Sequence, residues 1–446
     1  MSIGSHTPIT IITNDSWTRI ITAWEASSEE KQKWRQKKMN SNIDLDELEK
    51  CCVSGLSSVV RNKKIVLIGP PTRSRMMISA FKKSGAADVI SISLDSSYYS
   101  EISEYNNNFS QELRKPSQLL LKRINEIDPV REALVYAGSS IDVEWLDGRK
   151  IIGSRCRAWA NLERKEVQTK ILSVQHGYKS CFVFLDSMNM NRFIDLCREH
   201  YPCVISGELI KGIEMGTSKV FIINESTKEA ISYVYQELKQ SCSGFRIANY
   251  MNGMPITVYG FCSDDIFCYP PVIGIVGYRN LDGKVTAPGI IALKNLDIDL
   301  ERVREEVQDL IQKVTNKCGF CGAFGVDGVF NKGHYIIHDL NPRICAGFVF
   351  VSKYFGGKVP QNVVDIILRE HATQANELMS MLCGAAKNME YDDEVMIWKD
   401  KELSVQMTKD IQRDGFNQQF LKRVLGENEP LFDPCPEEVS YYDYQE

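Results

Sequence analysis

The sequence predicts an α/β protein, with a doubly wound parallel sheet in its N-terminal part and an α+β arrangement towards its C-terminus. The first observation is an unbroken apolar run at residues 65–68 that ends at Gly69, as buried parallel strands do. The second is the helical pattern at 75–84 followed by a strand pattern at 88–94, which completes a βαβ unit. The third is a later series of strand patterns separated by polar and glycine turns, which is typical of antiparallel pairing.

Composition limits the class of protein. The chain has 446 residues, 43% hydrophobic and 25% charged, as soluble globular domains do, and its length predicts two to four domains. A net charge of −5 argues against a dedicated nucleic-acid-binding surface. No stretch approaches the roughly 20 apolar residues of a membrane helix, and residues 1–13 lack the pattern of a secretory signal. We therefore expect a cytoplasmic protein with neither nucleic acid nor membrane as a partner.

Cysteine usage predicts free thiols in a reducing compartment. Of the 14 cysteines, only Cys318 and Cys321 form a C-x-x-C pair, and no second pair follows at zinc-site spacing. A free cysteine usually packs as a small apolar residue. Core or loop thiols are therefore the first interpretation of this pair, and a metal or redox role is the alternative.

The rest of the chain alternates helical and strand patterns. Ser226 and Glu229 form a capping box at the start of one helix. The strands at 245–251 and 255–262 are predicted to form a hairpin through an Asn-Gly turn. The predicted helices cover 159–173, 191–200, 226–240, 300–316, 363–371 and 402–425, and the other strands cover 202–206, 219–223, 273–278, 323–330 and 335–340.

The segment 325–343 carries the residues best suited to chemistry. Side chains alternate along a strand, so Asp339 and Asn341 share one face, and Asp327 on the paired strand can lie across from them. Carboxylate and amide oxygens suit a hard cation such as Mg²⁺. Arg343, one step further on the same side, can hold a phosphate or carboxylate through two hydrogen bonds. The apolar flanks of the second strand favour this interpretation over a solvent-facing pair of acids.

This segment resembles the metal-binding end of the ATP-grasp fold, in which an acid on one strand is followed by a second acid and then by x-Asn-x-Arg. The resemblance covers residues 155–372 and implies ATP as cofactor, with Mg²⁺ or Mn²⁺. It implies that Asp327, Asp339 and Asn341 ligate the metal. Arg343 would contact the transferred phosphoryl group or the substrate carboxylate.

The same resemblance implies further nucleotide contacts. Arg279 would be a second catalytic arginine near the phosphates. Ser206 stands where many members of the family place a lysine, and Asp339 stands where glutamate is commoner. The implied nucleotide-binding residues are Lys165, then Lys211, Gly216, Thr217, Ser218 and Lys219 in and beside a glycine-bearing loop, and Asn249, Tyr250 and Met251 at a hinge.

The resemblance also implies a domain plan. It comprises an N-terminal pre-ATP-grasp α/β domain at 1–155, linking helices at 156–201, a small lobe at 202–262, a large lobe at 263–375 and a C-terminal extension at 376–446.

The function that the resemblance implies is a carboxylate–amine ligase. Such an enzyme activates a carboxylate as an acylphosphate, couples it to an amine and releases ADP and phosphate. The partners would be small molecules of amino-acid or peptide type, and a homodimer is compatible with the resemblance. One alternative is a nucleotide-binding module without turnover, which the serine at position 206 favours. A dinucleotide-dependent oxidoreductase is disfavoured because no G-x-G-x-x-G motif lies near Gly69.

Overall fold

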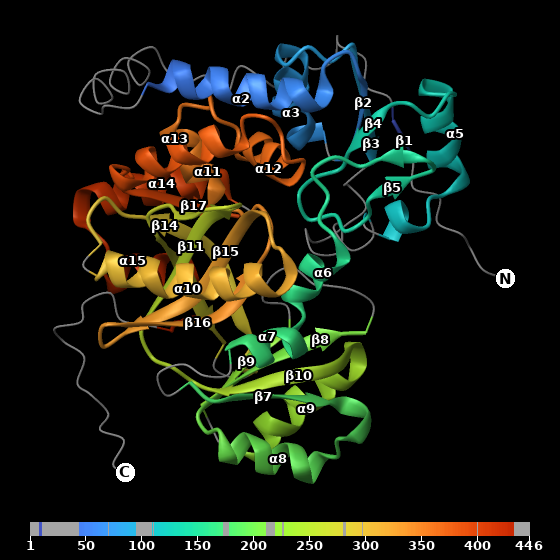
Figure 1. Cartoon of the computed structure of the whole chain (residues 1–446). Helices are drawn as coiled ribbons and strands as arrows, with labels where there is room; N and C mark the ends of the chain where they lie inside the picture. Colours follow the sequence, from blue (N-terminus) through green and yellow to red (C-terminus); the bar gives the residue numbers. More distant parts are fainter. Residues whose placement is uncertain are drawn as a thin grey trace.

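The computed structural model confirms the predicted fold class, with a parallel sheet at the N-terminus followed by two antiparallel sheets (Figure 1). No helix of the described residues is both long and apolar enough to cross a membrane. The structure describes residues 9–10, 44–69, 71–94, 109, 111–172, 178–210, 219–224, 227–279, 282–296, 298–398 and 400–431.

The N-terminal sheet has the strand order β1-β3-β2-β4. β2 (Lys64–Gly69) pairs in parallel with β3 (Asp88–Leu94) on one side and with β4 (Leu134–Tyr136) on the other. β1 (Ile9–Thr10) adds an antiparallel edge. The chain thus runs from β2 to one side and returns to the other, so the sheet is wound in both directions.

Helices cover both faces of this sheet. Leu67 packs in a core shared with α2 (Leu45–Val60) and α3 (Pro71–Lys83), whereas Val66 packs in a second core with α5 (Gln118–Ile127). Neighbouring residues of one strand point to opposite faces, which is why an unbroken apolar run suits a strand buried on both sides. A short hairpin, β5 (Trp145–Leu146) and β6 (Arg149–Lys150), follows β4.

The second sheet forms a small lobe. The helices α8 (Met190–Glu199) and α9 (Lys228–Ser241) pack against this sheet. In the core between helices and sheet, the rings of Phe193 and Phe245 meet edge to face at 5.2 Å. Thr227 caps α9, while Ser226, the predicted cap, lies outside the described residues. In order across the sheet the strands are β7 (Ser180–Phe184), β10 (Cys242–Asn249), β8 (Cys203–Leu209) and β9 (Val220–Ile223).

The third and largest sheet has eight strands. The helix α10 (Leu300–Cys318) covers one face of this sheet, and the helices that follow β16 cover the other (Figure 1). Apolar side chains of β11 pack into the core on each of these faces. Across the sheet the strands are β16 (His334–Asn341), β15 (Gly322–Asn331), β11 (Met254–Cys262), β13 (Val272–Tyr278), β14 (Val285–Ala292) and β17 (Glu394–Ile397), with β12 (Ile266–Cys268) on β11 and β18 (Glu429–Pro430) on β13.

The remaining helices connect or cover these sheets. α7 (Lys165–Leu172) contacts strands of both the small and the large sheet, so it lies at their junction. The others are α6 (Arg157–Ala160), the 3-10 turns η3 (Asn161–Glu163) and η4 (Leu185–Ser187), α11 (Phe348–Tyr354), α12 (Gln361–Arg369), α13 (Ala375–Lys387), α14 (Lys401–Asp414) and α15 (Gln418–Leu425).

The predicted hairpin of 245–251 with 255–262 is wrong. β10 pairs with β7 and β8 in the small lobe, whereas β11 pairs with β15, β13 and β12 in the large sheet. The intervening residues therefore form a crossing between two sheets and not a tight turn within one. Accordingly, the strand predicted to end the small lobe belongs to the large sheet, and the C-terminal region contributes β17 and β18 to that sheet.

The buried Arg369 links the N-terminal part of the chain to the large sheet. Arg369 of α12 lies 3.0 Å from Asp365, and each side chain is only 1% exposed. The guanidinium also donates to the backbone oxygens of Ser139 and Gly153 at 3.0 Å and of Pro342 at 3.3 Å. Arg369 thus links the loops that contain Ser139 and Gly153 to the end of β16.

Candidate active site

Two aspartates face each other on the β15–β16 hairpin, as the alternation of side chains predicts. Asp327 pairs directly with Asp339, and the register then shifts, which leaves His338 as the extra residue of a bulge. Asn341 lies on the same face and donates from Nδ2 to Oδ2 of Asp327 at 2.9 Å. The structure therefore brings together the three side chains predicted to bind a metal.

The negative charge of the Asp327 carboxylate is poorly stabilised by its surroundings. Its Oδ1 accepts a hydrogen bond at 2.6 Å from Thr257, the residue opposite it on β11. Burial and the charge of Asp339 raise the pKa of Asp327 to about 6, although the Thr257 hydrogen bond opposes the shift. A carboxylate in this situation is stabilised by a nearby cation.

Asp339 has a cation already beside it. The ammonium of Lys165, at the start of α7, lies 2.6 Å from Oδ1 of Asp339. Burial favours the neutral acid, but Lys165 and the buried Arg246 of β10 outweigh it and lower the pKa of Asp339. The two facing carboxylates are thus unequal, because only Asp339 is ionised well below neutral pH.

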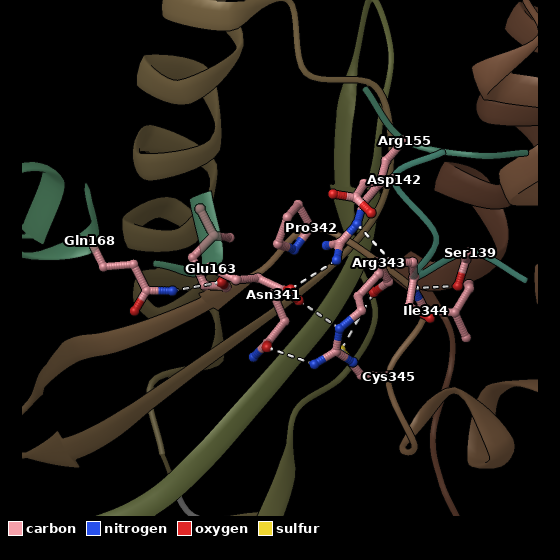
Figure 2. Close-up of polar contacts among 12 residues, drawn as sticks. Ser139, Asp142, Arg155, Glu163, Gln168, Asn341, Pro342, Arg343, Ile344 and Cys345 are labelled. Carbon is pink, nitrogen blue, oxygen red and sulfur yellow. Dashed lines mark hydrogen bonds and ion pairs between the residues drawn. The ribbon is translucent and has the colours of Figure 1, made fainter. Parts of the chain in front are cut away.

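Arg343 extends the site beyond the end of β16 (Figure 2). Its Nε donates to Oε1 of Glu163 at 2.6 Å, and its Nη2 donates to Oδ1 of Asn341 at 3.0 Å. Burial disfavours the charged guanidinium, but Glu163 outweighs this and raises the pKa of Arg343. The arginine is therefore a permanent cation held beside the acid pair.

The donor set fits a divalent cation in part. Asp327 and Asp339 supply carboxylates from adjacent strands, which is the ligand type that Mg²⁺ prefers. The amide of Asn341 donates to one neighbour and accepts from Arg343, so its oxygen is directed at the guanidinium. Among the described residues no cluster of three or more His, Cys, Asp or Glu side chains is suited to a metal, so two acids and one amide are the set available here.

The three predicted hinge residues lie where the chain crosses from the small to the large sheet. Asn249 accepts at 2.6 Å from the backbone N–H of Lys179, and the Tyr250 hydroxyl donates to the backbone oxygen of Leu431 at 2.8 Å. Met251 packs beside a small apolar cluster between the lobes. They lie at the crossing between the two sheets, and their roles as a hinge and in binding adenine stay predictions.

Two other predicted residues do not join the site. Lys219 points to α9, where it lies 3.4 Å from Glu237. Arg279 is exposed and directly follows β13. About 20 Å of strand separates it from Val272, which lies level with Asp327 because both pair with Thr257 of β11. β13 thus carries Arg279 away from Asp327, and its contact with a phosphate stays a prediction. Lys211, Gly216, Thr217 and Ser218 lie outside the described residues.

Sequence reasoning missed four residues of this site. Thr257 and Arg246 reach the acids only because their strands lie next to the hairpin and α7, which their own sequence surroundings do not indicate. Glu163 belongs to a run of charged residues that suggests a solvated helix, yet it is only 7% exposed. Arg155, which pairs with Glu163 at 2.9 Å, likewise carries no local signal.

The two cysteines of the C-x-x-C pair are free thiols in the structure. Cys318 donates to the backbone oxygen of Val314 at 3.3 Å, and Cys321 donates to that of Leu368 at 3.5 Å. Burial raises the pKa of Cys321 to about 12, so its thiolate is scarce at neutral pH.

Comparison with known proteins gives distant structural likenesses. No family model and no curated protein matches the chain. Carboxyaminoimidazole ribonucleotide synthase from Aspergillus clavatus, complexed with ATP, is 13% identical with a TM-score of 0.49, covering 79% of this chain and 87% of that one. Biotin carboxylase from Campylobacter jejuni, as a β-γ-ATP complex, is 13% identical with a TM-score of 0.46, and the match covers 73% of this chain and 69% of that one. D-alanine–D-alanine ligase from Bacillus anthracis is 13% identical with a TM-score of 0.44, covering 71% and 99%. Since these likenesses are remote, the roles of the site residues rest on the contacts of this chain itself.

Proposed function

We propose that this protein is an ATP-dependent ligase that activates a carboxylate as an acylphosphate and couples it to an amine. The substrates are small molecules of amino-acid or peptide type. The observation that carries the proposal is the in-register pair of Asp327 and Asp339, flanked by the cations Lys165 and Arg343 where the two lobes meet. Two acids for a metal and two cations for phosphates are the groups that phosphoryl transfer requires.

The reaction has two balanced steps. A carboxylate oxygen of the substrate attacks the γ-phosphorus of ATP, and the bond from that phosphorus to the β–γ bridging oxygen breaks, so ADP leaves. The nitrogen of the amine then attacks the acyl carbon, phosphate leaves with the electron pair of the broken C–O bond, and the amine releases a proton. The protein needs no nucleophile of its own, because its contribution is alignment and charge stabilisation.

The residues divide these tasks. Asp327 and Asp339, with Asn341 as a third ligand, would hold Mg²⁺. When bound, that ion neutralises charge on the phosphates. Lys165 reaches Asp339 from the junction of the lobes, so its ammonium can be shared between this acid and a phosphate oxygen. Arg343 offers its outer nitrogens to the transferred phosphoryl group or to the substrate carboxylate.

The test is carboxylate-dependent release of ADP. The purified chain is incubated with ATP, Mg²⁺ and pools of amino acids and other carboxylic acids, and ADP and condensed products are measured. Asp339→Ala, checked for folding by circular dichroism, is expected to lose nearly all turnover. Release of ADP that depends on no carboxylate would contradict the proposed ligase.

A nucleotide-binding module without turnover is the second candidate. One observation favours it: both acids already have protein partners, since Lys165 pairs with Asp339 and Asn341 donates to Asp327. If these contacts persist with nucleotide present, the acids are less available to a metal. Calorimetric binding of ATP together with no ADP from any carboxylate pool would favour this candidate over the ligase.

A further inference from the structure

Glu163 lies between two arginines that come from different parts of the chain (Figure 2). Its Oε1 accepts from Nε of Arg343 at 2.6 Å, and its Oε2 accepts from Nη2 of Arg155 at 2.9 Å. The side chains are 5% exposed for Glu163, 12% for Arg343 and 4% for Arg155. One buried carboxylate is thus shared by two guanidinium groups.

The contacts of Arg343 show what the carboxylate does for it. Nε is held by Glu163, Nη2 by the oxygen of Asn341 at 3.0 Å, and Nη1 faces the sulfur of Cys345 at 3.7 Å. Glu163 is the only one of these three partners that carries a charge. A charge-assisted hydrogen bond is about twice as strong as a neutral one, so Glu163 dominates the orientation of the guanidinium plane.

Glu163 is itself fixed from the opposite side. Arg155 donates from Nε to the backbone oxygen of Ser140, in the loop after β4, and from Nη2 to Glu163. Glu163 also ends the 3-10 turn that stands two residues before Lys165. This one short segment therefore positions both cations of the site, Lys165 directly and Arg343 through the carboxylate.

We propose that Glu163 is a positioning residue of the active site, which sets the guanidinium of Arg343 against Asn341 and the acid pair. The inference rests on the proposed ligase function, because Arg343 acts there on the transferred phosphoryl group or the substrate carboxylate. Glu163 itself touches neither. Its negative charge is the property that matters, since Arg343 and Arg155 would otherwise face each other without a shared counter-ion.

The experiment compares two substitutions that separate charge from size. Glu163→Gln keeps the volume but places an NH₂ group against one of the two guanidiniums, whereas Glu163→Asp keeps the charge and is shorter by one methylene. Glu370→Gln is the matched control: Glu370 also joins the N-terminal domain to the large sheet, through Gly153 N–H at 3.1 Å and Lys150, without contacting Arg343. Steady-state kinetics and the Nε–H NMR resonance of Arg343, assigned by its loss in Arg343→Lys, are measured for each.

Glu163→Gln is expected to lower kcat by about tenfold to a hundredfold while the KM for ATP changes less than twofold, and Glu163→Asp is expected to recover part of the loss. The Arg343 resonance should shift in Glu163→Gln and stay in place in Glu370→Gln. Better activity in the glutamine variant than in the aspartate variant, or an equal loss in Glu370→Gln, would overturn the inference, because packing or domain fastening would then explain the effect. A wild-type protein without carboxylate-dependent turnover refutes the ligase alone, and the Arg343 resonance then decides the positioning role by itself.

Discussion

Replacing Asp327 by asparagine should stabilise the metal-free protein at neutral pH. Its pKa rises from the ordinary 3.8 to about 6, because burial and Asp339 oppose its ionisation. An acid whose pKa is raised by folding destabilises the native state progressively as the pH rises above the unfolded pKa, and the effect is complete above the folded pKa. The roughly two-unit shift corresponds to about 3 kcal/mol at pH 7.5.

One hydrogen bond reduces this gain. Asp327 accepts from Thr257 and from Asn341, and an asparagine would present its own NH₂ to one of these two donors. The loss of one such bond costs about 1 kcal/mol, so the net stabilisation is about 2 kcal/mol at pH 7.5. Near pH 4 the electrostatic gain is absent and only the loss remains. The difference between variant and wild type should therefore change sign between pH 4 and pH 7.5.

Urea unfolding with a chelator present, followed by circular dichroism across this pH range, measures the effect. Asp339→Asn is the control with the opposite sign: folding lowers the pKa of Asp339, so this acid stabilises the protein at neutral pH and loses that contribution as the pH falls. If Asp327→Asn is less stable than the wild type at pH 7.5, or differs from it equally at both ends of the range, the electrostatic reasoning is refuted.

Three further outcomes are expected. Lys165→Met leaves Asp339 without its ion pair at 2.6 Å, so calorimetry should show weaker ATP binding and urea unfolding should show a lower stability. Unchanged ATP affinity would show that the lysine does not belong to the nucleotide site. Arg369→Met leaves the buried Asp365 without a counter-charge, which should cost about 3–5 kcal/mol of unfolding free energy, whereas Lys150→Met breaks an exposed pair and should cost at most about 1 kcal/mol. Mg²⁺ should raise the melting temperature of the wild type but not of Asp339→Asn, and an equal rise in both would place the ion elsewhere.

Local patterns were sufficient for much of the fold. A local pattern predicts an element well when it reflects how that element alone is buried. Examples are the apolar run of β2, the amphipathic pattern of α10 and the alternation in β15 and β16. The acid pair was predictable for the same reason. Its two strands are joined by a short turn, which leaves few registers for their pairing.

Partners distant in sequence could not be predicted in this way. The strand pattern around the Asn-Gly dipeptide suits a hairpin, but β10 and β11 each find better partners in separate sheets, and tertiary pairing overrides the local turn signal. Glu163 shows the same limit. A glutamate in a charged run is usually solvated, and only the approach of Arg155 and Arg343 makes its burial favourable.

The Tyr250 hydroxyl bond to Leu431 has a mechanical consequence. Tyr250 sits in the crossing between the lobes, and Leu431 directly follows β18, which is paired with β13 of the large sheet. The crossing between the two sheets is therefore bonded to the segment directly after β18. Any change of angle between the two sheets at this crossing would therefore act directly on β18 through this hydrogen bond.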